Sequence, residues 1–379
     1  MRGLDQRINW GARAICIEGA RGTGKSTLML QHIQKNLPRE KTLYISLDDI
    51  YFREHTFSEV ADAFYKQGGR YLFADEVHKY PNWQQEVKNT YDFFPDLQLV
   101  VSGSSILALQ QSQADLSRRL LRYQLTELSF REFIALKEGV ELSTYSLKVI
   151  ISEPNVIVAE LLQKIPSPLK LFAEYLAFGA YPFFVEGEEE FLIRVNQLIN
   201  VIIDYDLPEA KTIETATQAK LKKLLYIVST SVPFKPNIAK LAVQLGTSRA
   251  RLLELLHLLE KAQLLHNLRS GVFGTSLMNK PEKIFLRNTS LIMALAEGKP
   301  NKGNLRETFF LSQLVNAGHK VTYPKTGDFR VDEKYLFEIG GKNKTRKQII
   351  KEEQAFIAAD DIEYGFGQKI PLWLFGFLY

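Results

Sequence analysis

The residues with the clearest chemistry are eight consecutive ones near the start of the chain: Gly19, Ala20, Arg21, Gly22, Thr23, Gly24, Lys25 and Ser26. They match the pattern G-x-x-x-x-G-K-[ST], a loop whose backbone N–H groups surround nucleotide phosphates. We expect Lys25 to reach the β- and γ-phosphates and the Ser26 hydroxyl to bind Mg²⁺. The spacing therefore predicts a binding site for a nucleoside triphosphate, with ATP and Mg²⁺ as cofactors.

The flanking segments are of the kinds that position such a loop. The apolar residues 14–18 predict a buried strand, and residues 27–36 predict a helix. Because a helix N-terminus attracts anions, Thr27 is also expected to lie against the phosphates. The alternative is a glycine-rich loop without a ligand. Chance alone should produce the fixed positions only about once in 100 chains of this size.

A second motif places two carboxylates at the end of an apolar run, residues 71–76. We expect Asp75 to orient Mg²⁺ or its water shell. The adjacent Glu76 would polarise the attacking water as a general base. An ordinary strand that runs into an acidic turn would look the same. Because the motif at residues 71–76 lies about fifty residues after the phosphate loop, we favour the catalytic interpretation.

A third apolar run, residues 98–105, ends in small hydroxyl residues. Either Ser102 or Ser104 would sit between the carboxylates and the γ-phosphate and sense the phosphate. The equal alternative is that a serine caps a following helix at residues 106–110.

Residues 1–135 alternate predicted strands and helices, which indicates an α/β domain with a parallel sheet covered on both faces. A nucleotide would bind at the carboxyl ends of its strands. Further strands are expected at 41–46 and 121–125, and an amphipathic helix at 57–65.

Composition narrows the class of protein. The chain has 379 residues, 45% of them apolar, so two or three domains with real cores are expected. A net charge of +5 permits a nucleic-acid partner without requiring one. The only cysteine, Cys16, rules out an internal disulfide and favours a reducing compartment. Without a secretory signal or a run of about 18 apolar residues, the prediction is a cytoplasmic protein with no membrane partner.

The middle of the chain is mostly helical from 136 to 235, and residues 236–280 have the outline of a winged helix-turn-helix. Two helices, at 237–245 and 249–260, precede a strand at 264–268. In one interpretation Ser248, Arg249 and Arg251 begin a recognition helix in a DNA groove. In the other, slightly favoured, the module is a structural lid or a protein contact.

The last hundred residues return to mixed structure. A helix is expected at 304–315 and a strand pair at 328–331 and 335–339, with a buried last strand in 370–379. Four basic residues follow the strand pair and form either a solvated loop or a phosphate contact: Lys342, Lys344, Arg346 and Lys347.

Together these motifs resemble a family of prokaryotic AAA+-type ATPases that join a P-loop domain to a C-terminal half of undefined function. The resemblance spans nearly the whole chain and includes the 19–26 loop, Asp75-Glu76 and residues 128–133. It implies an arginine finger or phosphate sensor near Ser117-Arg118-Arg119, where Arg118 replaces the family's glycine. Arg119 is the matching arginine, Arg122 is close by, and a surface arginine is the alternative.

The C-terminal region also resembles a restriction-endonuclease-type core. Glu307, Asp328 and Glu338 match its acidic positions, but Gly340 stands where the lysine is expected. Lys342 would share the strand face of Glu338, one pleat, roughly 6.6 Å, further along. We therefore expect a nuclease-like fold that has lost its chemistry and remains as a binding module.

The sequence as a whole predicts an ATPase that uses Mg²⁺ and ATP to drive a conformational switch. The expected regions are a P-loop ATPase domain (1–135), a helical domain (136–235), a winged helix-turn-helix (236–280) and an α+β restriction-endonuclease-like domain (281–379). The partner would be DNA or an unidentified protein, and a homo-oligomer is compatible with the pattern. The competing functions are a nucleotide-gated protein-interaction switch without DNA binding and a metal-dependent nuclease.

Overall fold

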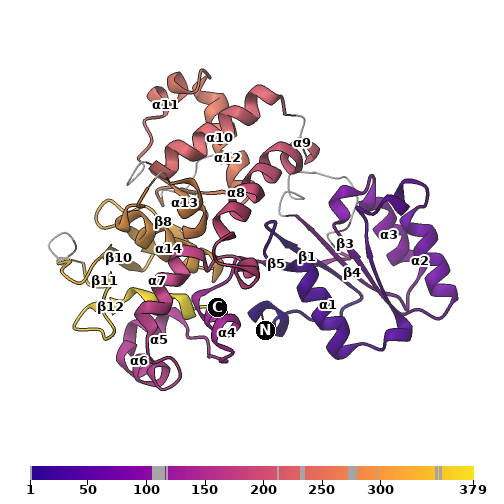
Figure 1. Ribbon diagram of the computed structural model, residues 1–379, viewed down its shortest axis with the longest axis horizontal. Coiled ribbons are helices and arrows are strands. Elements are labelled where there is room, and N and C mark those ends of the chain that lie inside the picture. Colours follow the sequence, from indigo (N-terminus) through magenta and orange to yellow (C-terminus); the bar gives the residue numbers. More distant parts are fainter. Residues whose placement is uncertain are drawn as a thin grey trace. The chain divides into compact units, whose positions relative to one another are not determined.

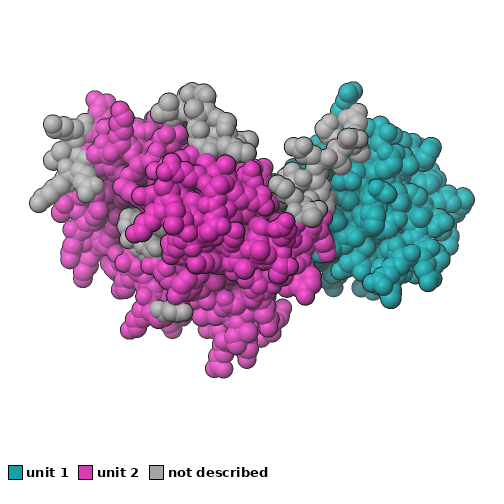
Figure 2. Space-filling view, turned by 90° about the horizontal axis from the view of Figure 1, so that it is seen from above, with its two compact units in different colours: residues 1–126 teal, residues 127–379 magenta. Residues whose placement is uncertain are grey.

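The computed structural model describes residues 2–104, 116, 118–210, 213–230, 235–271, 280–296, 298–345, 349 and 352–379. The chain folds as two compact units, residues 1–126 and 127–379 (Figures 1 and 2). No described helix is long and apolar enough to cross a bilayer. The predicted helix at 106–110 and residues Ser117, Arg346 and Lys347 lie outside the described residues.

The first unit is built on a parallel five-stranded sheet in the order β2-β3-β4-β1-β5 (Figure 1). The strand bounds are Ala14–Gly19 (β1), Thr42–Ser46 (β2), Tyr71–Asp75 (β3), Gln98–Ser104 (β4) and Leu121–Leu125 (β5). This confirms the parallel α/β sheet that the alternation of elements predicts. In such a sheet all carboxyl ends lie along one edge.

Helices cover both faces of this sheet. α1 (Lys25–Asn36) packs Leu28 and Met29 on one face, against Ile15 of β1 and Val100 of β4. On the other face lie α2 (Phe57–Lys66) and α3 (Trp83–Phe93), with the buried thiol of Cys16 in the same core. The unit also contains short 3₁₀ turns: η1 (Gly3–Gln6) before β1, and η2 (Arg39–Lys41), η3 (Ile50–Arg53) and η4 (Val77–Lys79) between later elements.

The second unit begins with helices. They are α4 (Phe130–Glu138), α5 (Leu147–Ser152), α6 (Pro154–Leu162), α7 (Pro168–Phe178), the 3₁₀ turn η6 (Pro182–Glu186), α8 (Phe191–Val201), the π-helical turn η7 (Ile202–Asp206), α9 (Leu207–Ala210) and α10 (Thr215–Thr230). A helix pair follows, α11 (Ile238–Gln244) and α12 (Arg249–Lys261), and then an antiparallel strand pair, β6 (Leu265–Leu268) and β7 (Lys283–Leu286).

The second unit ends in another five-stranded sheet, in the order β12-β11-β10-β9-β8. Two helices lead into it, α13 (Thr289–Leu295) and α14 (Lys302–Asn316). The strands are β8 (Val321–Thr322), β9 (Phe329–Val331), β10 (Tyr335–Gly340), β11 (Ala355–Ala359) and β12 (Lys369–Pro371). β10, β11 and β12 run parallel, whereas β9 is antiparallel to β10.

The C-terminal segment differs from the strand expected over 370–379. Only Lys369–Pro371 pair as a strand, and Leu372–Phe377 form a buried 3₁₀ helix, η8. Pro371 lies in the edge strand and has no N–H to donate, so the ladder ends there. The apolar run is buried as expected, but against helices: Gly376 lies close to Phe130 of α4.

Candidate functional site

The 19–26 loop joins β1 to α1 in the conformation that its glycines permit. Gly22 and Gly24 have φ values of 80° and 91°, in the left-handed region that side chains with a Cβ rarely adopt. At Gly19 a Cβ would lie 2.4 Å from the carbonyl oxygen of Leu125, the last residue of β5. The loop is therefore packed tightly against the end of the neighbouring strand.

Lys25 lies buried at the start of α1, and its Nζ donates to the carbonyl oxygens of Gly19 and Ala20, each at 3.2 Å. The Thr23 hydroxyl donates to the Ala20 carbonyl at 2.8 Å. Because carbonyl oxygens are neutral, these two contacts hold the ammonium group in the loop without cancelling its positive charge.

Asp75 ends β3 and is almost fully buried. One of its carboxylate oxygens accepts a hydrogen bond from the Ser102 hydroxyl of β4, and the other accepts from the Tyr44 hydroxyl of β2 at 2.6 Å. Tyr44 also hydrogen-bonds Ser26, and burial together with Asp75 raises the pKa of its phenol. Neutral donors from both neighbouring strands thus fix the Asp75 side chain close to Ser26.

Glu76 follows with its backbone in the left-handed region, at φ 52°. Non-glycine residues adopt this conformation rarely, and such outliers concentrate at functional sites. Burial raises the pKa of its carboxyl group, Lys25 and Arg21 lower it, and Asp75 and Asp48 raise it. The net shift is upward, which suits a group that must accept a proton near neutral pH.

The other predicted residues of the first unit fall in different places. The backbone N–H of Ser104 donates to His78 Nδ1 at 3.4 Å. Arg119 forms a bidentate pair with Asp92 at the end of α3, with both N–O distances 2.9 Å. Arg122 pairs with Glu18. The role of each arginine in phosphate sensing stays a prediction.

The residues that surround Asp75 fit a magnesium ion. Mg²⁺ prefers hard oxygen ligands, usually one or two from the protein together with waters and substrate phosphates. The Ser26 hydroxyl and the Asp75 carboxylate are such ligands, and Tyr44 contacts both. These two side chains would therefore hold the ion beside the phosphates.

The acidic residues predicted for a nuclease-like site lie in the second unit and are paired with lysines. Lys283 Nζ lies 3.0 Å from Glu307 Oε2 and 3.5 Å from Asp328 Oδ1. Lys344 Nζ lies 2.9 Å from Glu338 Oε1. Lys342 is exposed, and its carbonyl accepts a hydrogen bond from Lys369.

Sequence reasoning missed four residues that the structure brings to these sites: Tyr44, His78, Lys283 and Arg2. Lys283 is a lysine at the head of an apolar strand, 45 positions from Asp328, and only that burial pattern could have drawn attention to it. Tyr44 lies between apolar neighbours in β2, and its side chain is polar only at the hydroxyl group at the end of its ring. Their partners lie on other elements, so no local spacing reveals the contacts.

Comparison with known proteins agrees with this arrangement. Residues 11–134 match the family described as an AAA domain, and residues 169–302 match a domain of unknown function. Over 386 aligned residues the chain is 27% identical to the uncharacterized protein MJ1637 of Methanocaldococcus jannaschii, covering 94% of this chain and 81% of that protein.

Two solved structures were also compared. A RuvB variant from Thermotoga maritima has a TM-score of 0.27 at 14% identity, covering 68% of this chain and 82% of that one. The S. cerevisiae Hsp104–ADP complex has a TM-score of 0.31 at 15% identity, covering 69% and 37%. The family match and the parallel sheet with its phosphate-type loop lead to one conclusion: the N-terminal part of this chain is an AAA domain, joined to a C-terminal domain of unknown function.

Proposed function

We propose that this protein is an ATPase that binds ATP with Mg²⁺ at the carboxyl edge of its first sheet and uses hydrolysis to drive a conformational switch. One observation carries the proposal. Tyr44 hydrogen-bonds both Asp75, at the end of β3, and Ser26 of the phosphate loop, so the loop with its buried Lys25 and the Asp75-Glu76 pair lie together at one edge of the sheet. Residues 19–27 supply the phosphate contacts, and Ser102 supplies the sensor.

Each side chain has a distinct task in this mechanism. Lys25 neutralises the phosphate charge, and Ser26 with Asp75 would hold the metal ion, which supplies charge stabilisation to the transferring phosphoryl group when bound. Glu76 orients the attacking water and accepts its proton, because its raised pKa makes it a better base than an ordinary glutamate.

The switch would begin at the phosphate loop. In the first unit, Arg2 donates from NH1 to the Thr23 carbonyl at 2.6 Å and from NH2 to the Thr126 carbonyl at 2.5 Å. Thr126 is the last residue of that unit. A shift of the loop on phosphate binding would therefore reach the peptide that leaves the AAA domain.

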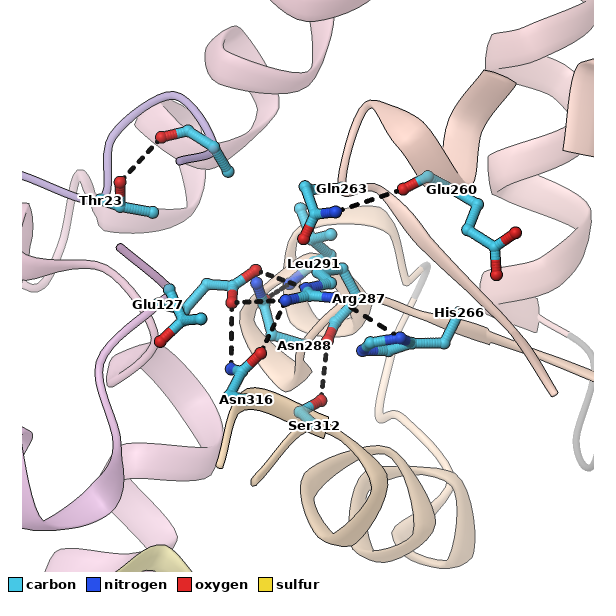
Figure 3. A network of polar contacts seen from close by, with 12 residues as sticks. Thr23, Glu127, Glu260, Gln263, His266, Arg287, Asn288, Leu291, Ser312 and Asn316 are labelled. Atoms are coloured by element: carbon cyan, nitrogen blue, oxygen red, sulfur yellow. Dashed lines mark hydrogen bonds and ion pairs between the residues drawn. The ribbon is translucent and has the colours of Figure 1, made fainter. Parts of the chain in front are cut away.

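The next residue, Glu127, is held firmly in the second unit (Figure 3). Its Oε1 accepts from Arg287 Nε at 2.9 Å and its Oε2 accepts from Asn316 at 3.1 Å, in a site where Glu127 and Arg287 are both buried. Arg287 precedes α13, and Asn316 ends α14. Removing either partner of a buried, hydrogen-bonded ion pair is costly, so these contacts hold Glu127 in place beside α13 and α14. We infer that the 126–127 junction couples nucleotide state to these helices.

The test is equilibrium binding of ATP in the presence of Mg²⁺ by calorimetry. Lys25→Ala should weaken binding at least about tenfold, because hydrogen bonds to charged groups contribute about 1.5–3 kcal/mol and each 1.4 kcal/mol is tenfold. Lys35→Ala, an exposed position on the same helix, is the matched control and should bind as the wild type does. Unchanged affinity in Lys25→Ala would refute the assignment of the loop.

Association with DNA is a second candidate because the elements α10, α11, α12, β6 and β7 follow one another in the order of a winged helix-turn-helix. Ser248 caps α12, Arg249 is exposed in its first turn, and Arg251 pairs with Glu254. If this surface binds DNA, the affinity should fall steeply with salt, and neutralising Arg249 and Arg251 should reduce that slope. ATP-dependent capture of a protein without DNA binding would instead support the interaction switch.

A further inference from the structure

His78 lies between the proposed base and the end of the sensor strand. It sits in the 3₁₀ turn η4 directly after Glu76, and its side chain is only 6% exposed. Its Nε2 is 3.4 Å from Glu76 Oε2, and its Nδ1 is 3.4 Å from the backbone nitrogen of Ser104. Ser104 is the last residue of β4, the strand that also carries Ser102.

The contact with Ser104 determines which ring nitrogen carries the proton. A backbone N–H can only donate, so Nδ1 must accept and is unprotonated. In a neutral imidazole the single proton is then on Nε2, the nitrogen that faces Glu76. The N–H on Nε2 lies near the Glu76 carboxylate at ion-pair range, without the geometry of a hydrogen bond, and Ser104 fixes the tautomer in which Nε2 can donate.

Glu76 needs such a partner. Its side chain is 25% exposed, and it can rotate about several bonds, whereas a general base must hold one geometry relative to its water. We propose that His78 is the positioning residue for Glu76. Its Nε2 is placed to donate to the carboxylate, and its Nδ1 accepts from the backbone of the sensor strand. Glu76 remains the base, and His78 positions it. The inference rests on the ATPase function proposed above.

This contact also gives β4 two connections to the catalytic carboxylates. Ser102 bonds Asp75 through its hydroxyl, and Ser104 reaches Glu76 through His78. A displacement of the end of β4 when Ser102 meets the γ-phosphate would therefore move both acidic side chains together. Catalytic geometry would be completed only when the phosphate is in place.

The experiment distinguishes the roles of the two ring nitrogens of His78, Nε2 and Nδ1. His78→Gln keeps an amide N–H at a reach close to that of Nε2, so it can still donate to Glu76. His78→Asn keeps an oxygen near the position of Nδ1, so it can still accept from Ser104, but it lacks the donor to Glu76. His78→Ala removes both. For each variant we would measure kcat for ATP hydrolysis and, separately, the Kd for ATP.

We expect His78→Ala and His78→Asn to lower kcat about 10- to 100-fold, since a displacement of about 1 Å at a catalytic group can reduce the rate that much. Their Kd for ATP should stay within about twofold of the wild type, which also shows that the phosphate loop is folded. His78→Gln should retain most of the wild-type kcat. In a Glu76→Gln background, His78→Ala should cause no further loss, because the group it positions is gone.

Three outcomes would overturn the inference. They are wild-type turnover in His78→Ala, a His78→Gln variant as slow as His78→Ala, and a His78→Ala change that lowers kcat as much in the Glu76→Gln background as in the wild type. Failure of the underlying function has a different signature. In that case the wild-type chain itself shows no ATP turnover that Glu76→Gln removes, and both proposals fall together.

Discussion

Two clusters of lysines and carboxylates, one in each unit, contain similar residues and use them differently. At the edge of the first sheet, Lys25 bonds neutral carbonyls, and Asp75 accepts from hydroxyl groups. In the second unit, Lys283 bonds the carboxylates of Glu307 and Asp328 directly. The described contacts of Lys25 and Asp75 in the first cluster are with neutral groups, whereas in the second cluster a lysine pairs with two carboxylates.

This difference indicates what each cluster can do. An ammonium group bonded to neutral carbonyls retains its attraction for an anionic ligand. A carboxylate that pairs with an ammonium group keeps its charge, but the neighbouring positive charge weakens its attraction for a divalent cation, and the pair ties segments together. Lys283 joins β7 to α14 and to the start of β9. We therefore interpret the first cluster as a ligand site and the second as a structural contact.

The largest expected effect tests the first cluster. Glu76→Gln should lower kcat for ATP hydrolysis by about 10²–10⁴-fold, the usual contribution of a general base, and leave ATP binding intact. Steady-state hydrolysis at saturating ATP and calorimetry on the same preparation measure the two quantities. Glu54→Gln, an exposed position in the same unit, should behave as the wild type does. Full turnover in Glu76→Gln would move the base to another residue.

The second prediction tests the structural role of Lys283. Lys283→Met should lower the free energy of unfolding of the second unit by about 3–5 kcal/mol, the typical result of removing one partner of a buried ion pair. Lys283 is 4% exposed, and it lowers the pKa of Glu307, which burial raises. Denaturant unfolding monitored in the second unit measures the loss.

Matched variants sharpen that result. Lys280→Met changes an exposed lysine nearby and should have little effect. Adding Glu307→Gln to Lys283→Met should recover part of the stability, because the unpaired carboxylate is then neutral. A Lys283→Met protein as stable as the wild type would show that the lysine is dispensable, and the contrast between the two clusters would lose its basis.

A smaller effect concerns pH and the network around Glu127. His266 is buried beside Arg287 (Figure 3). Its burial, and to a lesser extent the positive charge of Arg287, hold its pKa well below 6.5. In the unfolded chain the His266 imidazole takes up a proton near pH 6.5, whereas in the folded chain it stays neutral. The free energy of unfolding is therefore constant above this pH and falls as the pH drops below it. The loss should be about 1.4 kcal/mol at pH 5.5 relative to pH 7.5.

The measurement is denaturant unfolding at both pH values for the wild type and His266→Gln. The variant should lose this part of the pH dependence, whereas His55→Gln, at an exposed position, should retain it. An identical pH dependence in the wild type and His266→Gln would contradict the assignment of a neutral, buried imidazole.

The smallest expected difference is at Asp328. The Asp328 carboxylate pairs with Lys283 and accepts a hydrogen bond from the backbone N–H of Ile339 at 2.9 Å. If these structural contacts are its role, Asp328→Ala should not alter DNA cleavage in Mg²⁺ or Mn²⁺. Any cleavage in the wild-type preparation should persist in the variant as a background. Metal-dependent cleavage that disappears in Asp328→Ala would establish the nuclease and reverse our interpretation of the second cluster.

Much of the first unit could be predicted because its signals are local. The apolar runs that predict β1, β3 and β5 lie within one or two residues of the observed strands, and the glycines of the loop lie where positive φ is required. The C-terminal run was predicted less well. Its apolar character indicates burial equally in a strand and in a 3₁₀ helix, and the structure resolves this at Pro371.

The sequence by itself determined the loop that can hold phosphates, the carboxylates that end β3, and the alternation that makes a parallel sheet. All three follow from spacing along the chain. Only the tertiary structure decided that Tyr44 and Ser102 hold Asp75, that His78 faces Glu76, and that Lys283 neutralises the second cluster. The physical reason is that a charge acts on whatever lies within a few ångströms of it. The order of strands in a sheet sets those neighbours, and local sequence does not record that order.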